Sequence, residues 1–418
     1  MNYRKRYIEP TLLEALKNFR GVFLFGPRQS GKTILSKHIA EILKINYLSF
    51  DEAEILNTAK NYPESFFDLF PLPLVIDEVQ KAPEIIPQLK IQLDKNPSRG
   101  QVLLTGSADF RKIKPIRESL VGRLIGIKLY PYSTAEIFSR KNSLLKQLFE
   151  GQKTNTVYNT HLTDLLNFIT RGFFPEIVEY DIKDKNLSLW YDDYINNHII
   201  KDLDAIETIR NKQKFINFVY ALAWQTAGLI NVSNLSRQTG LSRPTVEKYL
   251  SLLQELFITE YLRPFYDNTS KRFVKQPKLF FTDTGLLTHL LQTSAQSLIL
   301  NHNLMGKIFE NWIYTELAKE ISYRPSEYKL FFVRDDQKQE IDFLVENKHN
   351  ELIAIEVKAK TNIRNQDLKS INTLSKKLNF RHIYIFYLGD YWLPKKINDK
   401  TLWCIPAGFL MEKNIYML

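Results

Sequence analysis

The segment Gly26-Pro27-Arg28-Gln29-Ser30-Gly31-Lys32-Thr33 decides the fold of the first part of this chain, because it reads G-x-x-x-x-G-K-T. A short apolar run, 22–25, precedes it, and a helix-compatible segment, 34–42, follows it. In that setting the backbone amides of the loop and the amino end of the helix can bind phosphates. We expect Lys32 to reach the β- and γ-phosphates of ATP and the Thr33 hydroxyl to ligate Mg²⁺.

A second nucleotide signal is an apolar run, 74–76, that ends in two carboxylates, Asp77 and Glu78. It matches the Walker B arrangement of a buried strand with acidic residues at its carboxyl end. We expect Asp77 to lie near the Mg²⁺ held by Thr33, and Glu78 to orient and deprotonate the water that attacks the γ-phosphate. A pair of acidic residues capping a strand is the alternative, and the preceding G-K-T loop favours the functional interpretation.

Apolar strand-like runs alternate with helical stretches through the first third of the chain, which predicts a doubly wound parallel sheet. The predicted strands are 21–25, 47–50, 74–76, 102–105 and 126–129. The fourth ends at Thr105, followed by Gly106-Ser107, so Thr105 or Ser107 is a candidate sensor of the attacking water. A Gly-Ser turn without a role is the alternative for either residue.

Arg117 and Arg123 are candidates for completing the γ-phosphate pocket, either of their own subunit or of a neighbouring one. An arginine in this position accelerates phosphoryl transfer by about 10³- to 10⁵-fold. Arg123 is the stronger candidate, and a role in a neighbouring subunit would imply a homo-oligomer. Most arginines lie on the surface without such a role.

These motifs resemble a large prokaryotic family of AAA-type ATPases whose members carry a carboxyl-terminal domain of unknown function. The residues that carry the resemblance are the loop 26–33, Val-Ile-Asp-Glu-Val-Gln-Lys-Ala-Pro at 75–83, Leu-Leu-Thr-Gly-Ser-Ala at 103–108 and Ser-Leu-x-Gly-Arg at 119–123. The resemblance covers nearly the whole chain. It implies a P-loop NTPase fold and ATP hydrolysis, and it implies no cellular role.

The middle of the chain predicts a helix-turn-helix. The first helix is expected at 232–239, Gly240-Leu241-Ser242 forms the turn, and the second helix runs over 243–253. Ser242 is a suitable N-cap, and Gly240 can adopt the positive φ that ends the first helix. The segments 261–265 and 278–281 then predict the hairpin of a winged helix.

Such a module places its second helix in a DNA groove and its basic hairpin on phosphates. The candidate DNA contacts are Arg243, Thr245 and Lys248 on the second helix and Lys271 and Arg272 at the hairpin tip. Two alternatives remain open, a protein–protein adaptor and the lid of a nucleotide-binding module.

The last part of the chain carries a nuclease-like pattern. Alternating apolar residues at 339–346 and 352–358, with a polar turn between them, predict a β-hairpin that brings Asp342 near Glu356 and Lys358. Two carboxylates can hold Mg²⁺, while the lysine positions water or stabilises the charge that develops during phosphodiester hydrolysis. Glu310, in a preceding helix, adds a third carboxylate. The pattern resembles the PD-(D/E)xK nuclease fold, especially branched-DNA resolvases and restriction-type enzymes. A degenerate fold that only binds nucleic acid is the alternative.

Composition sets outer limits on the class of protein. The net charge of +11, from 57 basic and 46 acidic residues, suits a polyanionic partner such as nucleic acid. The single cysteine, Cys404, excludes an intramolecular disulfide and a cysteine-based zinc site. The sequence has no recognisable secretory signal and no run of about 18 apolar residues, so we expect a cytoplasmic protein without a membrane partner.

Together the patterns predict four parts. These are an AAA-type P-loop ATPase core with a parallel sheet (1–138), a helical lid or connector (139–210), a winged-helix domain (211–295) and an α/β restriction-endonuclease-like domain (296–418). The leading hypothesis is an ATP-hydrolysing, Mg²⁺-dependent protein that acts on or binds DNA, with nuclease activity in the last domain left open. The rival is a nucleotide-dependent signalling switch whose nuclease fold is inert.

Overall fold

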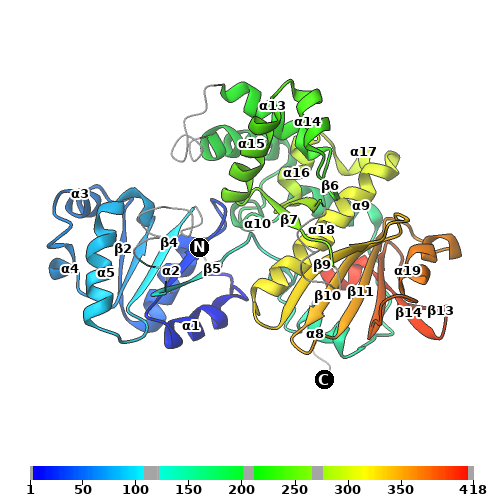
Figure 1. Ribbon diagram of the computed structural model, residues 1–418, viewed down its shortest axis with the longest axis horizontal. Coiled ribbons are helices and arrows are strands. Elements are labelled where there is room, and N and C mark those ends of the chain that lie inside the picture. Colours follow the sequence, from blue (N-terminus) through cyan, green and yellow to red (C-terminus); the bar gives the residue numbers. More distant parts are fainter. Residues whose placement is uncertain (1–2, 108–119, 121, 201–210, 266–275, 413–418) are drawn as a thin grey trace. The chain divides into compact units, whose positions relative to one another are not determined.

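The chain folds into two compact units in the computed structural model (Figure 1). The structure describes residues 3–107, 120, 122–200, 211–265 and 276–412. Unit 1 comprises residues 1–132 with 253–257, and unit 2 comprises 133–252 and 258–418. The predicted boundary near 138 therefore lies six residues after the first division. Apart from residues 253–257, unit 2 takes in the three parts predicted after that boundary, and their separation from one another stays a prediction.

Unit 1 contains a five-stranded parallel sheet in the order β2-β3-β4-β1-β5. Its strands are β1 (Gly21–Phe25), β2 (Asn46–Ser49), β3 (Leu74–Asp77), β4 (Val102–Gly106) and β5 (Leu124–Lys128). Each of the five predicted strands is present within two residues at both ends. Because β1, β4 and β3 are parallel, the loop after β1 and the carboxylates at the end of β3 lie at the same edge of the sheet.

Helices cover the sheet because its central strands are apolar along their whole length. Every residue of β1, β3 and β4 is buried, which is typical of a parallel sheet enclosed on both faces. The helices of unit 1 are α1 (Glu9–Asn18), α2 (Lys32–Leu43), α3 (Ala53–Asn61), α4 (Phe66–Leu69) and α5 (Ile86–Lys95), with short 3₁₀ turns η1 (Val79–Lys81) and η2 (Pro83–Ile85). Phe23, Phe50 and Phe66 lie in the core between them.

One group of helices in unit 2 comes from two stretches of the chain, 134–199 and 284–300. They are α7 (Thr134–Ile137), α8 (Leu144–Phe149), α9 (Leu162–Arg171), α10 (Pro175–Glu179), α11 (Asp184–Asp193), the π-helical η3 (Tyr194–Ile199), α16 (Thr284–Leu290) and α17 (Ala295–Leu300). The apolar stripe of α9 explains its packing, because Leu165, Leu166 and Ile169 are buried at helical spacing. Residues of α9 contact both α16 and α17.

The predicted helix-turn-helix is present as α14 (Val232–Thr239) and α15 (Arg243–Glu255). Gly240 ends α14 with φ at +67°, and Ser242 Oγ accepts a hydrogen bond from the Thr245 amide at 3.3 Å, as predicted. Helix α13 (Lys212–Ala223) precedes them. A three-stranded sheet of β6 (Gly228–Leu229), β8 (Lys278–Phe281) and β7 (Thr259–Leu262) accompanies the helices. This order of elements is compatible with a winged helix, and that interpretation stays a prediction.

The carboxyl-terminal part of unit 2 is a six-stranded sheet in the order β13-β14-β12-β11-β10-β9. The strands are β9 (Tyr328–Arg334), β10 (Glu340–Asn347), β11 (Leu352–Lys358), β12 (His382–Tyr387), β13 (Leu393–Ile397) and β14 (Lys400–Pro406). The long helix α18 (His302–Ser322) and helix α19 (Lys369–Leu374) pack on it, with 3₁₀ turns η5 (Asn365–Leu368) and η6 (Ala407–Met411). Cys404 is buried in its core.

The predicted hairpin of β10 and β11 is confirmed, with Phe343 opposite Ile355 in an antiparallel register. This register brings Asp342 and Glu356 to neighbouring positions on the two strands. Among the described residues, no helix is both long enough and apolar enough to span a membrane.

Candidate functional site

The loop between β1 and α2 has the backbone that the G-x-x-x-x-G-K-T pattern predicts. Gly26 and Gly31 have φ of +151° and +93°, which favour glycine. A Cβ at Gly26 would lie 2.1 Å from the carbonyl oxygen of Leu129, so no other residue fits there without displacing that backbone. Helix α2 starts at Lys32, directly after Gly31, and its amino end therefore points into the loop.

Lys32 and Ser30 give the loop the chemistry of a phosphate site. The buried Lys32 ammonium donates hydrogen bonds to the carbonyl oxygens of Gly26 at 3.0 Å and Pro27 at 2.8 Å, which places the positive charge against the loop itself. The Ser30 hydroxyl is buried without a hydrogen-bond partner in the described part of the chain. A buried polar group normally has a partner, so this hydroxyl fits a loop built around a polar ligand.

The Asp77 carboxylate is fully buried at the end of β3, and three hydroxyl groups hold it. Thr33 Oγ1 donates to Asp77 Oδ2 at 2.8 Å, Tyr47 Oη donates to the same oxygen at 2.7 Å, and Thr105 Oγ1 donates to Oδ1. The threonine hydroxyl and the carboxylate that were predicted to share Mg²⁺ are therefore adjacent. Their oxygen chemistry fits this cation, which binds through carboxylates and substrate phosphates.

Burial and the hydrogen bond to Asp77 raise the pKa of Tyr47 well above its usual value. Tyr47 therefore stays protonated and remains a donor to the carboxylate. It lies on β2, next to β3, and the Lys37 ammonium lies 5.1 Å from the centre of its ring.

Glu78 follows β3 with φ at +58°, an uncommon conformation for a residue other than glycine. The Glu78 amide donates to Thr105 Oγ1 at 3.1 Å, which holds this turn against β4. The Gln80 amide nitrogen donates to the Glu78 carboxylate and lies 3.4 Å from Ser107 Oγ. Strained residues of this kind gather at functional sites. The structure thus joins Glu78 to both candidate sensors, directly to Thr105 and through Gln80 to Ser107.

Arg6 supports the loop from the amino-terminal segment. Its buried guanidinium donates to the carbonyl oxygens of Ser30 at 2.8 Å and Tyr130 at 2.7 Å, and lies 4.7 Å from the centre of the Tyr132 ring. These contacts fix the loop relative to the segment that follows β5.

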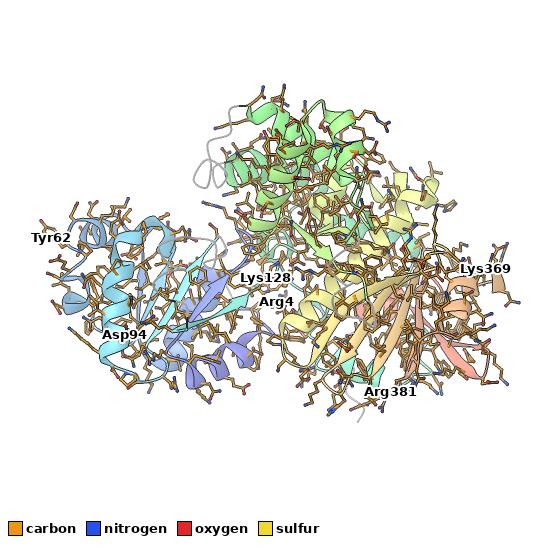
Figure 2. All side chains as sticks on the ribbon, viewed as in Figure 1. Arg4, Tyr62, Asp94, Lys128, Lys369 and Arg381 are labelled. Atoms are coloured by element: carbon orange, nitrogen blue, oxygen red, sulfur yellow. The ribbon has the colours of Figure 1, made fainter. Side chains whose placement is uncertain are left out.

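The structure contradicts one of the two predicted roles of Arg123, that in the pocket of its own subunit. Arg123 precedes β5, and the register of β5 with β1 places it at the amino edge of the sheet, whereas the loop 26–33 lies at the carboxyl edge. There it forms a two-pronged ion pair with Asp94, with both distances at 2.7 Å. Figure 2 shows Asp94 well away from Lys128, the residue paired with Phe25 at the carboxyl edge. Arg123 therefore cannot complete the γ-phosphate pocket of its own chain, and Arg117 lies outside the described residues.

Unit 2 brings the four predicted nuclease residues together. The Val357 amide donates to Asp342 Oδ2 at 2.9 Å, and the Asp342 amide lies 3.4 Å from Glu356 Oε2. The Lys358 ammonium pairs with Glu356 at 2.5 Å. Glu310, from α18, and Asp342 are joined through Lys278, a residue that the sequence analysis assigned only to a strand.

The Lys278 ammonium lies among three carboxylates. It is 2% exposed and approaches Glu340 at 2.6 Å, Glu310 at 2.8 Å and Asp342 at 3.5 Å. Burial opposes its charge, but the three carboxylates outweigh burial and raise the pKa of Lys278. Glu356 and Asp342 likewise outweigh burial at Lys358 and raise its pKa.

Two carboxyl groups of this cluster have strongly raised pKa values. Burial and the nearby Asp342 raise the pKa of Glu310 to about 8 and that of Glu356 to about 8. The cluster borders a cavity of about 750 Å³ whose lining includes Lys307, Lys360 and Arg364.

The predicted metal centre of Glu310, Asp342 and Glu356 is not formed in this arrangement. Within the described ranges, no group of three histidine, cysteine or acidic residues is placed to hold a metal ion. The physical reason is that Lys278 already supplies a positive charge between Glu310 and Asp342, and Lys358 pairs with Glu356.

Comparison with protein families identifies the fold of unit 1. Residues 18–138 match a family model described as an AAA domain. Unit 1 is an AAA-type P-loop domain. Residues 162–297 and 305–409 match two further models, each described as a domain of unknown function (DUF8612 and DUF4143).

Similar whole proteins carry no assigned role in their names. Uncharacterised proteins of Mycobacterium tuberculosis and Mycobacterium bovis are each 25% identical over 348 residues, covering 83% of this chain and 72% of the relative. Among solved structures, a Walker-type ATPase of Pyrococcus abyssi covers 69% of this chain and 96% of its own at 14% identity, with a TM-score of 0.42. The RuvB Holliday junction branch migration motor of Thermotoga maritima covers 60% and 88% at 16% identity, with a TM-score of 0.28.

Three residues at these sites are not among those predicted from the sequence. Tyr47 and Gln80 support the acidic pair of the AAA-type domain, and Lys278 neutralises the cluster of unit 2. The spacing of Gln80, two residues after Glu78, is a signal that could have drawn attention to it. Tyr47 and Lys278 carry no such signal, because their partners lie on other strands.

The predicted DNA-contact residues of α15 lie on its outer face. Arg243 and Lys248 are exposed, and Thr245 is half-buried. Lys271 and Arg272 fall outside the described residues. An apolar side of α15, with Val246 and Leu250 buried, packs inward.

Proposed function

We propose that this protein binds ATP with Mg²⁺ at the loop 26–33 of its AAA-type domain and hydrolyses it. The observation that carries the proposal is the hydrogen bond from Thr33 to the buried Asp77 at 2.8 Å, with Glu78 next in the chain. A hydroxyl and a carboxylate meeting beside a phosphate-binding loop are the residue types that ATP hydrolysis at a P-loop requires.

Thr33 and Asp77 would hold Mg²⁺. There the ion would supply positive charge to offset the negative charge that develops on the phosphates during transfer. The Lys32 ammonium exchanges its contacts with the Gly26 and Pro27 carbonyls for contacts with the β- and γ-phosphates. The fixed positions of these groups supply electrostatic stabilisation without rearrangement of solvent.

Glu78 would orient the attacking water and accept its proton. Its carboxylate accepts a hydrogen bond from Gln80, so it has a defined position before the nucleotide binds. Thr105 Oγ1 already contacts both Asp77 and the Glu78 amide, which links the metal side of the pocket to the water side.

The test is a comparison of ATP binding and turnover in three variants. Lys32→Ala is expected to lose ATP binding by about 100-fold or more, and Glu78→Gln to bind ATP but turn it over about 100-fold more slowly. Glu84→Gln, at an exposed glutamate six residues along the chain, is the matched control and should behave as the wild type. If Glu78→Gln turned ATP over at the wild-type rate, Glu78 would not be the residue that positions the water. If Lys32→Ala bound ATP with normal affinity, the loop 26–33 would not be the ATP site.

We infer DNA as the partner of unit 2. The support is the net charge of +11, the exposed Arg243 and Lys248 on α15, and the cationic lining of the cavity beside the acidic cluster. We propose no DNA cleavage, because Lys278 and Lys358 pair with the carboxylates that a nuclease would need for Mg²⁺. ATP turnover with and without linear, single-stranded and branched DNA tests the inference, and acceleration by DNA is expected.

The rival function is a nucleotide-dependent switch that acts on a protein partner. It predicts turnover that DNA leaves unchanged and binding to DNA no stronger than that of any basic protein. Both functions use the same ATP site, so the comparison with DNA separates them without depending on the variants above.

A further inference from the structure

Lys278 lies at the centre of a charge cluster whose members come from elements that are distant in the sequence. It begins β8, while Glu310 comes from α18 and Glu340 and Asp342 come from β10. Three carboxylate oxygens approach its one nitrogen atom at 2.6, 2.8 and 3.5 Å. Three acceptors match the three N–H donors of an ammonium group. The same set of oxygens around one point is also what a hard divalent cation binds.

The burial of Lys278 explains why its charge needs these three partners. Lys278 is 2% exposed, and a buried ammonium is strongly disfavoured unless it is paired. The acidic groups have a related requirement, since negative charges placed close together repel each other without a cation. Arg334 approaches Glu340 at 3.3 Å and relieves part of this charge from the outside. The inner counter-charge comes from Lys278.

We propose that Lys278 is a built-in cation that takes the place of a divalent metal among Glu310, Glu340 and Asp342. The cluster therefore works without Mg²⁺, and removal of the ammonium group turns it into a site for a divalent cation. The proposal is independent of ATP hydrolysis in unit 1. Its consequence is that the adjoining cavity presents a fixed, metal-free arrangement of charges to a ligand.

The second pair of charges supports this inference. Lys358 pairs with Glu356 at 2.5 Å, so the carboxylate on the far side of Asp342 is also satisfied by an amine. The Val357 amide holds the remaining oxygen of Asp342 at 2.9 Å. Each carboxylate that borders the cavity thus has a partner supplied by the chain itself.

The experiment measures Mn²⁺ binding to the full-length, nucleotide-free protein by the loss of its solution electron paramagnetic resonance signal. The wild type is expected to bind no Mn²⁺ at this cluster. Lys278→Met is expected to bind one Mn²⁺ at this cluster, at least about tenfold more tightly than any residual Mn²⁺ binding by the wild type, because the carboxylates then lack a counter-charge. Adding Asp342→Asn to that variant should abolish the gain and so locate the ion.

Thermal unfolding provides a second test of the same proposal. Lys278→Met should unfold at a lower temperature than the wild type, and Mn²⁺ should restore part of the loss through binding to the folded state. Lys319→Met is the matched control, because Lys319 is also buried and pairs with Glu316 outside the cluster. Lys319→Met should unfold at a lower temperature than the wild type, and Mn²⁺ should not restore that loss. Lys278→Gln, whose amide can still donate to a carboxylate, replaces Lys278→Met if the latter does not fold.

Two results would overturn the proposal. One is wild-type protein that binds Mn²⁺ in a manner abolished by Asp342→Asn, because the cluster would then be a metal site with Lys278 in place. The other is a folded Lys278 variant with no gain in Mn²⁺ affinity over the wild type.

Discussion

The Thr33 hydroxyl donates to Asp77 Oδ2 at 2.8 Å and joins the first turn of α2 to the carboxyl end of β3, across 44 positions of the chain. The same oxygen accepts a second hydrogen bond, from Tyr47 at 2.7 Å. A carboxylate fixed from two elements keeps its orientation when a cation approaches. The proposed Mg²⁺ site is therefore organised before the nucleotide arrives.

Tyr47→Phe removes one of these two donors while keeping the ring. A hydrogen bond contributes a net of about 0.5–1.5 kcal/mol, so we expect the Mg²⁺ concentration for half-maximal ATP turnover to rise about 2- to 12-fold. The rate of ATP turnover at saturating Mg²⁺ should change less than the Mg²⁺ concentration that turnover requires. Tyr62→Phe, at a tyrosine that is 66% exposed, serves as control. An unchanged Mg²⁺ requirement in Tyr47→Phe would show that Tyr47 does not position Asp77.

Arg123→Ala tests the corrected position of this arginine. The ion pair with Asp94 lies near the surface, so its loss should lower the melting temperature by no more than about 3 °C. ATP turnover should remain within about twofold of the wild type, because Arg123 lies at the opposite edge of the sheet from Lys32. A loss of about 100-fold or more in a folded protein would indicate instead that Arg123 acts in the pocket of a neighbouring copy.

The stability of unit 2 should fall as the pH rises toward 8. Burial raises the pKa of Glu356 to about 8, so between about pH 4.5 and 8 the folded protein retains a proton that the unfolded chain has released. Each rise in pH over that window favours unfolding, by roughly 1.4 kcal/mol per pH unit for one such group.

Glu356→Gln carries no titrating proton and should make this dependence less steep in urea unfolding followed at pH 6, 7 and 8, leaving the part that Glu310 contributes. The control is Glu150→Gln, at an exposed glutamate of unit 2, which should keep the wild-type slope. A slope that is the same in both variants and the wild type would contradict the raised pKa.

Removing Arg243 and Lys248 together tests the proposed DNA surface of α15. If both contact phosphates, Arg243→Ala/Lys248→Ala should weaken DNA binding and reduce the slope of log affinity against log salt by about 2. Lys146→Ala/Lys329→Ala removes the same charge from two exposed lysines elsewhere in unit 2, each 67% exposed, and is the matched control. Equal loss in the two double variants would mean that only net charge matters.

The nucleotide loop could be predicted from sequence alone because its constraints are local. Gly26 and Gly31 need conformations that few residues adopt, and Lys32 and Thr33 follow at a fixed spacing at the start of a helix. The hairpin that pairs Asp342 with Glu356 was predicted for a similar reason. Alternation along two strands joined by a short turn sets their register without reference to the rest of the chain.

The tertiary structure alone decided which side chains meet at each site. The strand order β2-β3-β4-β1-β5 puts Tyr47 against Asp77 and sends Arg123 to the far edge of the sheet, and no pattern within either segment specifies that order. Lys278 starts an apolar strand, where the sequence favours a solvated lysine. It became the buried partner of Glu310, Glu340 and Asp342 because β8, α18 and β10 converge, and only that convergence makes its charge stable away from water.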